Sequence, residues 1–260
     1  MMEPRTYFEL KRDAVYRYIL WQTTLGNQQN LYLAEFPKSG GTWLAQMLAR
    51  LLSLPFPRNT SVSRQPCILH GHHQIRSKNK RVIHLTRDGR DVMVSAYFYF
   101  LINDKNIFQN IWVKKMNKED LNDVKSNLPQ FIDIFFNNYK SGGTRKNWND
   151  FVLHYLEMKN VIQVRYEELN LHTSRTMTSL LHKLEIKTPS LPMKEVIERY
   201  SFKAQTGREK GQLDENAFLR RGNVGDWKNY FSRDAAEVFN FYAGEALISA
   251  GYEKTRNWYH

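Results

Sequence analysis

The stretch YLAEFPKSGGTWLAQMLARLL, residues 32–52, predicts a strand, a glycine turn and a helix in direct succession. Its second half repeats leucine and methionine at helical spacing. Such a turn brings unpaired backbone N–H groups to a helix N-terminus, where they bind anions. The usual nucleoside-triphosphate loop has its lysine after the last glycine, but here Lys38 precedes Gly40 and Gly41. The stretch therefore predicts a phosphate loop for a different kind of ligand.

Further strands and helices alternate along the rest of the chain. Strands are predicted at 31–36, 81–86 and 161–166, and helices from 42 onward, over 91–101 and over 234–251. The polar segment 102–150, with aromatic residues interspersed, is predicted to form a cap of helices and loops. Because alternating strands and helices favour a parallel sheet, we expect one α/β domain over 1–260, with a mostly parallel central sheet flanked by helices.

Composition narrows the class of partner. The chain has 38 Lys and Arg against 26 Asp and Glu, a formal charge of +12, which favours an anionic partner. We expect no nucleic-acid partner, because the sequence has neither a long basic run nor a Cys/His finger. It also has no apolar run that would span a bilayer and no signal-peptide core, so we expect no membrane partner and a cytoplasmic location. The single cysteine, Cys67, agrees with that compartment.

Three motifs, in order, resemble those of one enzyme family. The loop P-K-S-G-G-T-W (37–43) resembles the 5'-phosphosulfate loop of the PAPS-dependent cytosolic sulfotransferases, usually P-K-S-G-T-T-W. LTRDGRDVMVSAYFYF (85–100) is similar to their 3'-phosphate segment, and LRRGNVGDWKNYF (219–231) to their R-K-G-x-x-G-D-W-K signature. The resemblance extends over about residues 31–237. It implies a P-loop-kinase-like sulfotransferase fold and transfer of a sulfuryl group from 3'-phosphoadenosine 5'-phosphosulfate (PAPS) to a hydroxyl or amine of a small-molecule acceptor.

The resemblance also assigns the residues that bind PAPS and its product 3'-phosphoadenosine 5'-phosphate (PAP). The residues expected to bind the 5'-phosphosulfate are Lys38, Ser39, Gly40, Gly41 and Thr42. Lys38 is also expected to stabilise the leaving oxygen. The residues expected to bind the 3'-phosphate are Arg87, Ser95, Arg220, Arg221 and Gly222. Guanidinium groups and a hydroxyl are suitable hydrogen-bond donors to a phosphate. The residues expected to contact the adenine are Trp43, Tyr166, Tyr200, Ser201 and Phe202. Tyr166 is equally compatible with a core tyrosine whose hydroxyl reaches water.

The segment PCILHGHHQIRS (66–77) is expected to supply the catalytic base. A histidine that is neutral near pH 7 suits removal of a proton from the acceptor. Alignment with the family's K-T-H segment makes His72 the base, while a slip in register would select His70 or His73. Because the segment lacks an accompanying carboxylate or cysteine, it is a poor metal site on ligand count, and we expect no metal.

Some positions depart from the family pattern. Gly41 replaces a usual threonine. Ser232 and Arg233 replace the usual Thr-Val of a dimer segment, which leaves monomer or dimer open. The acceptor loops, 53–80 and 100–145, match least and do not identify the acceptor, although the compact chain resembles bacterial members that act on natural products. A small-molecule kinase and a non-catalytic nucleotide-binding protein are the alternatives, and the loop at 37–43 lacks the Lys-Ser/Thr pair of a kinase.

Overall fold

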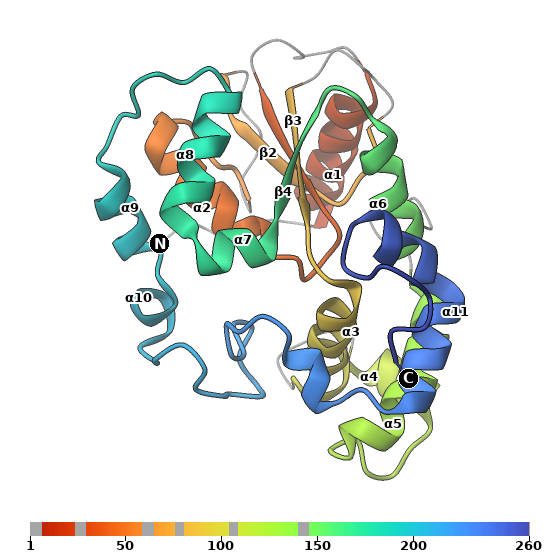
Figure 1. Cartoon of the computed structure of the whole chain (residues 1–260). Coiled ribbons are helices and arrows are strands. Elements are labelled where there is room, and N and C mark those ends of the chain that lie inside the picture. Colours follow the sequence, from red (N-terminus) through yellow and green to blue (C-terminus); the bar gives the residue numbers. More distant parts are fainter. Residues whose placement is uncertain are drawn as a thin grey trace.

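The computed structural model describes residues 7–23, 30–58, 65–75, 81–103, 109–139 and 146–259. Its centre is a parallel four-stranded sheet in the order β2-β1-β3-β4 (Figure 1). The strands are β1 (Leu31–Glu35), β2 (Ile68–Gly71), β3 (Arg81–Thr86) and β4 (Val161–Arg165). The predicted α/β fold with a parallel sheet flanked by helices is confirmed.

Alternation along β1 explains why both faces of the sheet are covered. Successive side chains of a strand point to opposite faces, and here Leu31 and Leu33 belong to one core while Tyr32 and Ala34 belong to the other. Every residue of β1 is buried. A continuous apolar run of this kind is typical of a central parallel strand, which has helices on each side.

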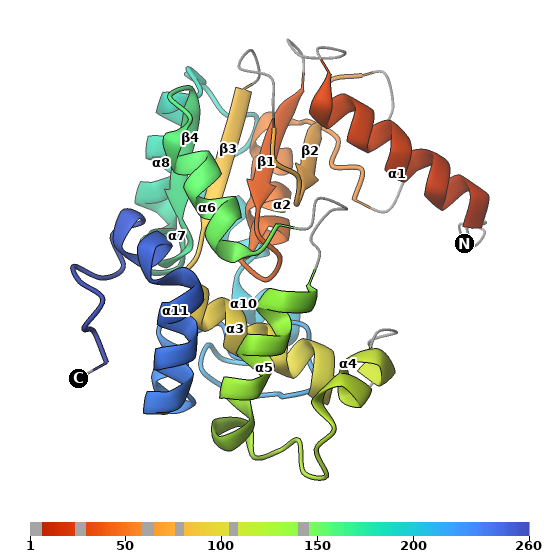
Figure 2. The same cartoon turned by 90° about the vertical axis from the view of Figure 1, so that its right-hand side faces the viewer.

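Two groups of helices cover the two faces. Beside Leu33 lie α2 (Gly41–Leu52), α7 (Tyr166–Leu171), α8 (Thr173–Lys183) and α9 (Met193–Arg199). The face of Tyr32 is covered by α1 (Tyr7–Gln22), α3 (Gly89–Tyr97), α5 (Val124–Asn138), α6 (Trp148–Glu157) and α11 (Arg233–Ser249). Figure 2 shows this second group in front of the sheet and below it. The remaining elements are a π-helical turn (Phe98–Ile102), α4 (Gln109–Met116), α10 (Phe202–Thr206) and a 3-10 turn (Asp226–Asn229).

The strand β2 corrects one sequence prediction. We expected residues 53–80 to be a loop, but Ile68–Gly71 within it forms an edge strand, with Leu33 opposite His70. It is only four residues long and ends in His-Gly, so it carries little periodic signal. The predicted helix 91–101 also differs, because the α-helical part ends at Tyr97 and continues as a π-helical turn.

The predicted cap over 102–150 is more deeply packed than expected. Trp112, Phe131, Phe135 and Phe136 are all buried in the core that α5 shares with α11. At the start of α11, Ser232 caps the helix by accepting a hydrogen bond from the N–H of Ala235. None of the helices in the described part of the chain combines the length and apolarity needed to cross a membrane.

Two phenylalanines on α11 provide a matched test of this core. Phe239 is 0 % exposed and lies between Phe136, Trp148 and Phe231, whereas Phe241 is 77 % exposed. We expect Phe239→Ala to lower the free energy of unfolding by about 3–5 kcal/mol, because it leaves a cavity. Phe241→Ala is the control and should change it by less than about 0.5 kcal/mol. Urea unfolding measures both, and equal losses would contradict the packing described.

Candidate functional site

The predicted phosphate loop adopts a backbone that only a few residues tolerate. Between β1 and α2, Lys38 has φ +74° and Gly40 has φ +94°, both in the left-handed region. A Cβ added at Gly40 would lie 2.8 Å from the Tyr166 ring, so only glycine fits there. Tyr166 is itself buried and lies directly after β4. The loop therefore wraps closely around the end of the sheet.

Two backbone amides of this loop are already bound within the protein. The N–H of Ser39 donates to the carbonyl of Phe36 at 3.2 Å, and the N–H of Gly41 donates to the carboxylate of Glu35. The expectation that all the amides from Ser39 to Thr42 are available to a ligand is therefore wrong for these two. The Ser39 hydroxyl, in contrast, is buried and has no hydrogen-bond partner among the described residues.

Glu35 also explains why glycine stands at position 41, where the family usually has threonine. A Cβ at Gly41 would lie 2.5 Å from Cδ of Glu35 and 2.7 Å from Nε2 of His70. A threonine does not fit there while Glu35 and His70 keep these positions. Burial alone would raise the pKa of Glu35, but its hydrogen bond with His70 and the charges of His70 and His72 leave that pKa below its ordinary value. Glu35 is therefore a carboxylate near pH 7.

Arg87, at the start of α3, faces the loop. Its Nη1 donates to the carbonyl of Lys38 at 3.0 Å, and its guanidinium lies 4.5 Å from the centroid of the Tyr166 ring. Nη2 is 3.6 Å from the carboxylate of Asp91. Nε of Arg87 is buried and has no hydrogen-bond partner in the described part of the chain. A buried N–H of this kind is costly unless a ligand accepts from it.

Two further arginines come from the segment between α10 and α11. Arg220 and Arg221 both bind Asp226, the latter at 2.8 Å. Burial works against ionisation of Asp226, but these two arginines leave its pKa below the ordinary value. The carboxylate of Asp91 accepts from the N–H groups of Gly225 and Trp227, at 2.8 and 2.9 Å. This contact fastens the segment to the helix that follows Arg87, so the three arginines face the same region.

The residues predicted to bind the adenine are linked by hydrogen bonds. Nε1 of Trp43 donates to the carbonyl of Tyr200 at 2.8 Å. The Trp43 ring lies edge-on to Tyr166, with centroids 6.3 Å apart. Asn170 donates to the carbonyl of Gly222 at 3.0 Å and thereby connects α7 to the arginine segment.

These contacts enclose a first cavity of about 360 Å³, lined by residues far apart in the sequence. Of the residues predicted to bind the cofactor, all but two line it: Lys38, Gly40, Gly41, Thr42, Trp43, Arg87, Ser95, Tyr166, Ser201, Phe202, Arg220, Arg221 and Gly222. Ser39 lies beneath the loop instead, and Tyr200 contributes its carbonyl to Trp43. Several other lining residues were not predicted, namely Arg58, Asn170, Lys210, Phe218 and Asn223. The first four stand outside the motifs, and Asn223 lies within the segment 219–231 at a position that received no role.

The neutral ring of His72 adopts the tautomer that a general base needs, with a lone pair on Nε2. Its Nδ1 lies 3.0 Å from the backbone carbonyl of Glu35. Because a carbonyl only accepts hydrogen bonds, Nδ1 carries the proton in the neutral ring and Nε2 carries the lone pair. Burial is the main cause that lowers the pKa of His72 to about 4, so the ring is neutral at pH 7.

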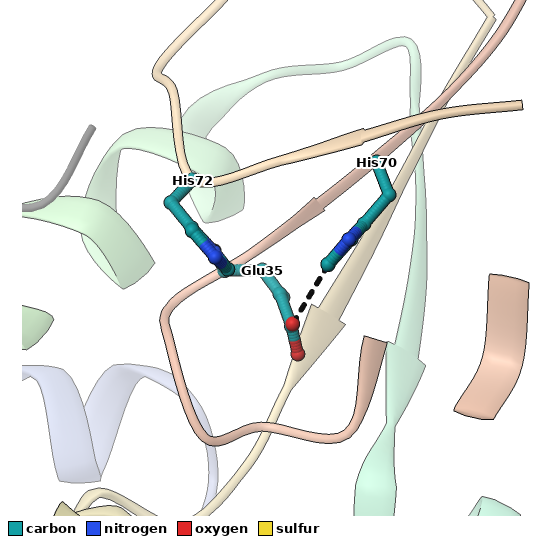
Figure 3. Close-up of side chains that lie close together, drawn as sticks. All are labelled: Glu35, His70 and His72. Atoms are coloured by element: carbon teal, nitrogen blue, oxygen red, sulfur yellow. Dashed lines mark hydrogen bonds and ion pairs between the residues drawn. The ribbon is translucent and has the colours of Figure 1, made fainter. Parts of the chain in front are cut away.

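The two alternative histidines are placed differently. His70 binds the carboxylate of Glu35 at 2.7 Å through Nε2, and Figure 3 shows Glu35 close to both His70 and His72. The His73 ring packs against Trp21 and Tyr18, with centroids 5.7 Å away in each case. Of the three, His72 is the one whose Nδ1 is held by a backbone carbonyl.

Glu35 also corrects the expectation that the histidine segment has no carboxylate beside it. Ligand atoms of Glu35, His70 and His72 lie within 4.8 Å of one another, although Glu35 is distant in the sequence. The contacts described above account for these atoms in another way. Glu35 accepts from His70 and from Gly41, and His72 donates to the main chain.

A second cavity, of about 680 Å³, opens on the histidine side of the loop. His70, His72 and His73 line it together with an aromatic wall that includes Tyr99, Phe100, Trp112, Phe135 and Tyr139. The two cavities share part of their lining, namely Glu35, Lys38, Thr42, Arg58 and Phe218. The predicted phosphate loop therefore separates the first cavity from the predicted base.

Lys38 stands at this shared wall. Its Nζ is 4.1 Å from the centroid of the Tyr99 ring and 4.0 Å from that of Phe218. Burial, together with the positive charges of Arg87, Arg220 and Arg58, lowers the pKa of Lys38 to about 7. An anion beside Nζ would stabilise the ammonium form and raise that pKa.

Comparisons with known proteins give one consistent family. The family model described as "Sulfotransferase domain" matches residues 58–251. Human sulfotransferase 2A1 is 24 % identical over 253 residues, 82 % of each chain. The 3-alpha-hydroxysteroid sulfotransferase of Cavia porcellus is 24 % identical over 268 residues, 88 % of this chain and 86 % of its own.

Solved structures share the fold. Mouse sulfotransferase SULT7A1, crystallised with PAP, superposes with a TM-score of 0.68 at 18 % identity, covering 96 % of both chains. Retinol dehydratase in complex with retinol and PAP gives a TM-score of 0.58 at 14 % identity, covering 85 % of this chain and 82 % of the other.

The fit of Gly41 against Glu35 can be tested by a double-mutant cycle. We expect Gly41→Ala to lower the free energy of unfolding by about 1–3 kcal/mol, because the added methyl overlaps the carboxylate. In a Glu35→Ala background the same change should cost at least about 1 kcal/mol less. Urea unfolding of the four proteins gives this coupling. An identical loss in both backgrounds would show that the two residues are not in contact.

Proposed function

This chain belongs to the sulfotransferase domain family, and from that premise we propose that it transfers the sulfuryl group of PAPS to a hydroxyl or amine of a small-molecule acceptor. PAPS supplies an activated sulfuryl group on a phosphate that leaves as PAP. The proposal includes a cytoplasmic location and a natural product as acceptor, with neither nucleic acid nor membrane as partner. Its support is the resemblance to compact cytosolic-type members.

The lining of the first cavity fits a nucleotide that bears two phosphate groups. Arg87, with its buried and unpartnered Nε, and Arg220 and Arg221 would hold the 3'-phosphate together with Ser95 and Gly222. The rings of Trp43, Tyr166 and Phe202 would hold the adenine, beside Ser201 and the carbonyl of Tyr200. The Ser39 hydroxyl, also buried without a partner, lies beneath the loop that would hold the 5'-phosphosulfate. Both orphaned groups support an anionic occupant.

Lys38 has the electrostatic role. A fixed cation beside the oxygen that gains negative charge stabilises the transition state more than the ground state. The loop conformation, with φ +74° at Lys38, turns the chain so that its Nζ reaches the wall between the two cavities. With a phosphate beside it, Lys38 would be protonated at neutral pH.

His72 has the role of base. The lone pair on Nε2 accepts the proton of the acceptor's hydroxyl or amine as its oxygen or nitrogen bonds to sulfur. The hydrogen bond from Nδ1 to the carbonyl of Glu35 fixes the tautomer and orients the ring. His72 later returns the proton to water, and no covalent intermediate with the enzyme is needed.

The main support for this proposal is the wall that the two cavities share. Two cavities meet at Lys38 and Thr42, one lined by four arginines and the other by histidines and aromatic rings. Group transfer requires this arrangement, because the phosphorylated donor and the acceptor must reach one point from opposite sides. A nucleotide-binding protein without catalytic function would have no need of the second cavity.

The donor is tested by calorimetric titration without metal. We expect PAP to bind with a dissociation constant in the micromolar range and AMP at least tenfold more weakly, a difference of about 1.4 kcal/mol. The reason is that AMP lacks the 3'-phosphate that Arg87 and Arg220 would bind. ATP serves as the control for a kinase. Binding of ATP equal to or tighter than that of PAP would refute the donor assignment.

The base is tested by three alanine variants. His72→Ala should lower turnover by about 10²–10⁴-fold, the usual contribution of general base catalysis. It should leave the dissociation constant of PAP within a few-fold, because His72 lies outside the first cavity. His70→Ala and His73→Ala are the matched controls. If either of them abolishes transfer while His72→Ala does not, the base is assigned to the wrong residue.

A further inference from the structure

Two arginines from distant parts of the chain meet at the second cavity. Arg17 projects from α1, and Arg58 lies after the end of α2. The guanidinium of Arg17 donates to the backbone carbonyl of Pro57, the residue directly before Arg58. This contact holds the two positively charged residues next to each other at the lining.

The lining carries more positive than negative charge. Among the described residues of the lining, the lysine and arginines are Lys38, Arg17 and Arg58, and the carboxylate is that of Glu35. Glu35 already accepts hydrogen bonds from His70 and from the N–H of Gly41. The field of Arg58 is one of the causes that lower the pKa of Lys38, so these charges act on one another across the cavity. Such an arrangement favours a negatively charged occupant.

Much of the remaining lining is aromatic. Phe135 and Tyr139 are stacked, with centroids 4.4 Å apart and planes at 11°, and Phe100 is stacked on Trp112 at 4.9 Å. Flat apolar surfaces of this kind bind aromatic rings. An acceptor that has both an aromatic ring and an anionic group would match both the apolar and the positively charged parts of this lining.

We propose that the acceptor of this enzyme is an anionic aromatic compound, whose carboxylate, sulfonate or phosphate is bound by Arg17 and Arg58 while its hydroxyl or amine faces His72. This inference rests on the proposed function for the transfer itself, but the anion site is a property of the cavity and can be measured without turnover. Arg58 also lines the first cavity, whereas Arg17 lines only the second. Arg17 is therefore the residue that separates acceptor binding from donor binding.

The experiment compares two fluorescent probes that differ in one charged group. 1-Anilinonaphthalene-8-sulfonate is an aromatic anion, and N-phenyl-1-naphthylamine is its uncharged counterpart. Each is titrated into the protein at about 0.15 M salt, where charges more than about 8 Å away are largely screened. The titrations are made with the free protein and with the protein saturated with PAP, so that binding to the first cavity is blocked in the second series.

We expect the sulfonate to bind at least tenfold more tightly than the neutral probe in both series. Arg17→Gln should reduce this ratio at least fivefold while the dissociation constant of PAP stays within a few-fold. Arg12→Gln is the matched control, because Arg12 lies on the same helix but its side chain is 58 % exposed and is not part of the lining. It should leave the ratio unchanged.

Three results would overturn the proposal: equal binding of the two probes, no binding of either, or an equal loss in Arg12→Gln and Arg17→Gln. The proposed function fails separately, if PAP does not bind. In that event a retained sulfonate preference in the free protein, lost in Arg17→Gln, would still establish the anion site. Steady-state kinetics would then compare a hydroxyaryl carboxylic acid with its uncharged amide as acceptors. The acid should have the lower KM, because only the acid has the anionic group.

Discussion

Glu35 connects the three parts of the site, and the rest of the geometry depends on it. Its carboxylate binds the N–H of Gly41, at the start of α2, and the ring of His70, on β2. Its carbonyl accepts from His72. One residue at the carboxyl end of β1 therefore fixes the phosphate loop and the proposed base relative to each other. A buried carboxylate is tolerated here because hydrogen bonds and nearby histidines offset its desolvation.

The same contacts explain why departures from the family pattern occur together. The usual threonine cannot stand at position 41 while Glu35 and His70 fill the adjacent space. His70 itself stands where the family has lysine. A lysine would bring a full charge to Glu35, whereas histidine binds it through a planar ring that also lies 5.3 Å from the ring of His72. We infer that Gly41 and His70 are adapted to each other through Glu35.

Much of the first cavity was predictable because its residues stand in contiguous motifs. Lys38, Arg87 and Arg220 each belong to a short pattern, and the parallel sheet brings the ends of its strands to one edge. The role of Glu35 was not predictable, because it is the last residue of an apolar strand and its contacts depend on the pairing of β1 with β2. That strand was itself missed, being only four residues long. Arg17 and Arg58 were missed because a tertiary contact brings them together, between Arg17 and Pro57, which are 40 positions apart in the sequence.

The positions of the charges also bear on how a donor and an anionic acceptor occupy adjoining cavities. Two anions repel each other strongly where the dielectric constant is low. Lys38 and Arg58 lie in the wall that both cavities share, so each would reduce that repulsion. Without ligands the cations repel one another. Burial and this repulsion together lower the pKa of Lys38. Binding of the donor would offset part of this positive charge and leave Arg17, which lines only the second cavity, as the cation that distinguishes a charged acceptor from a neutral one.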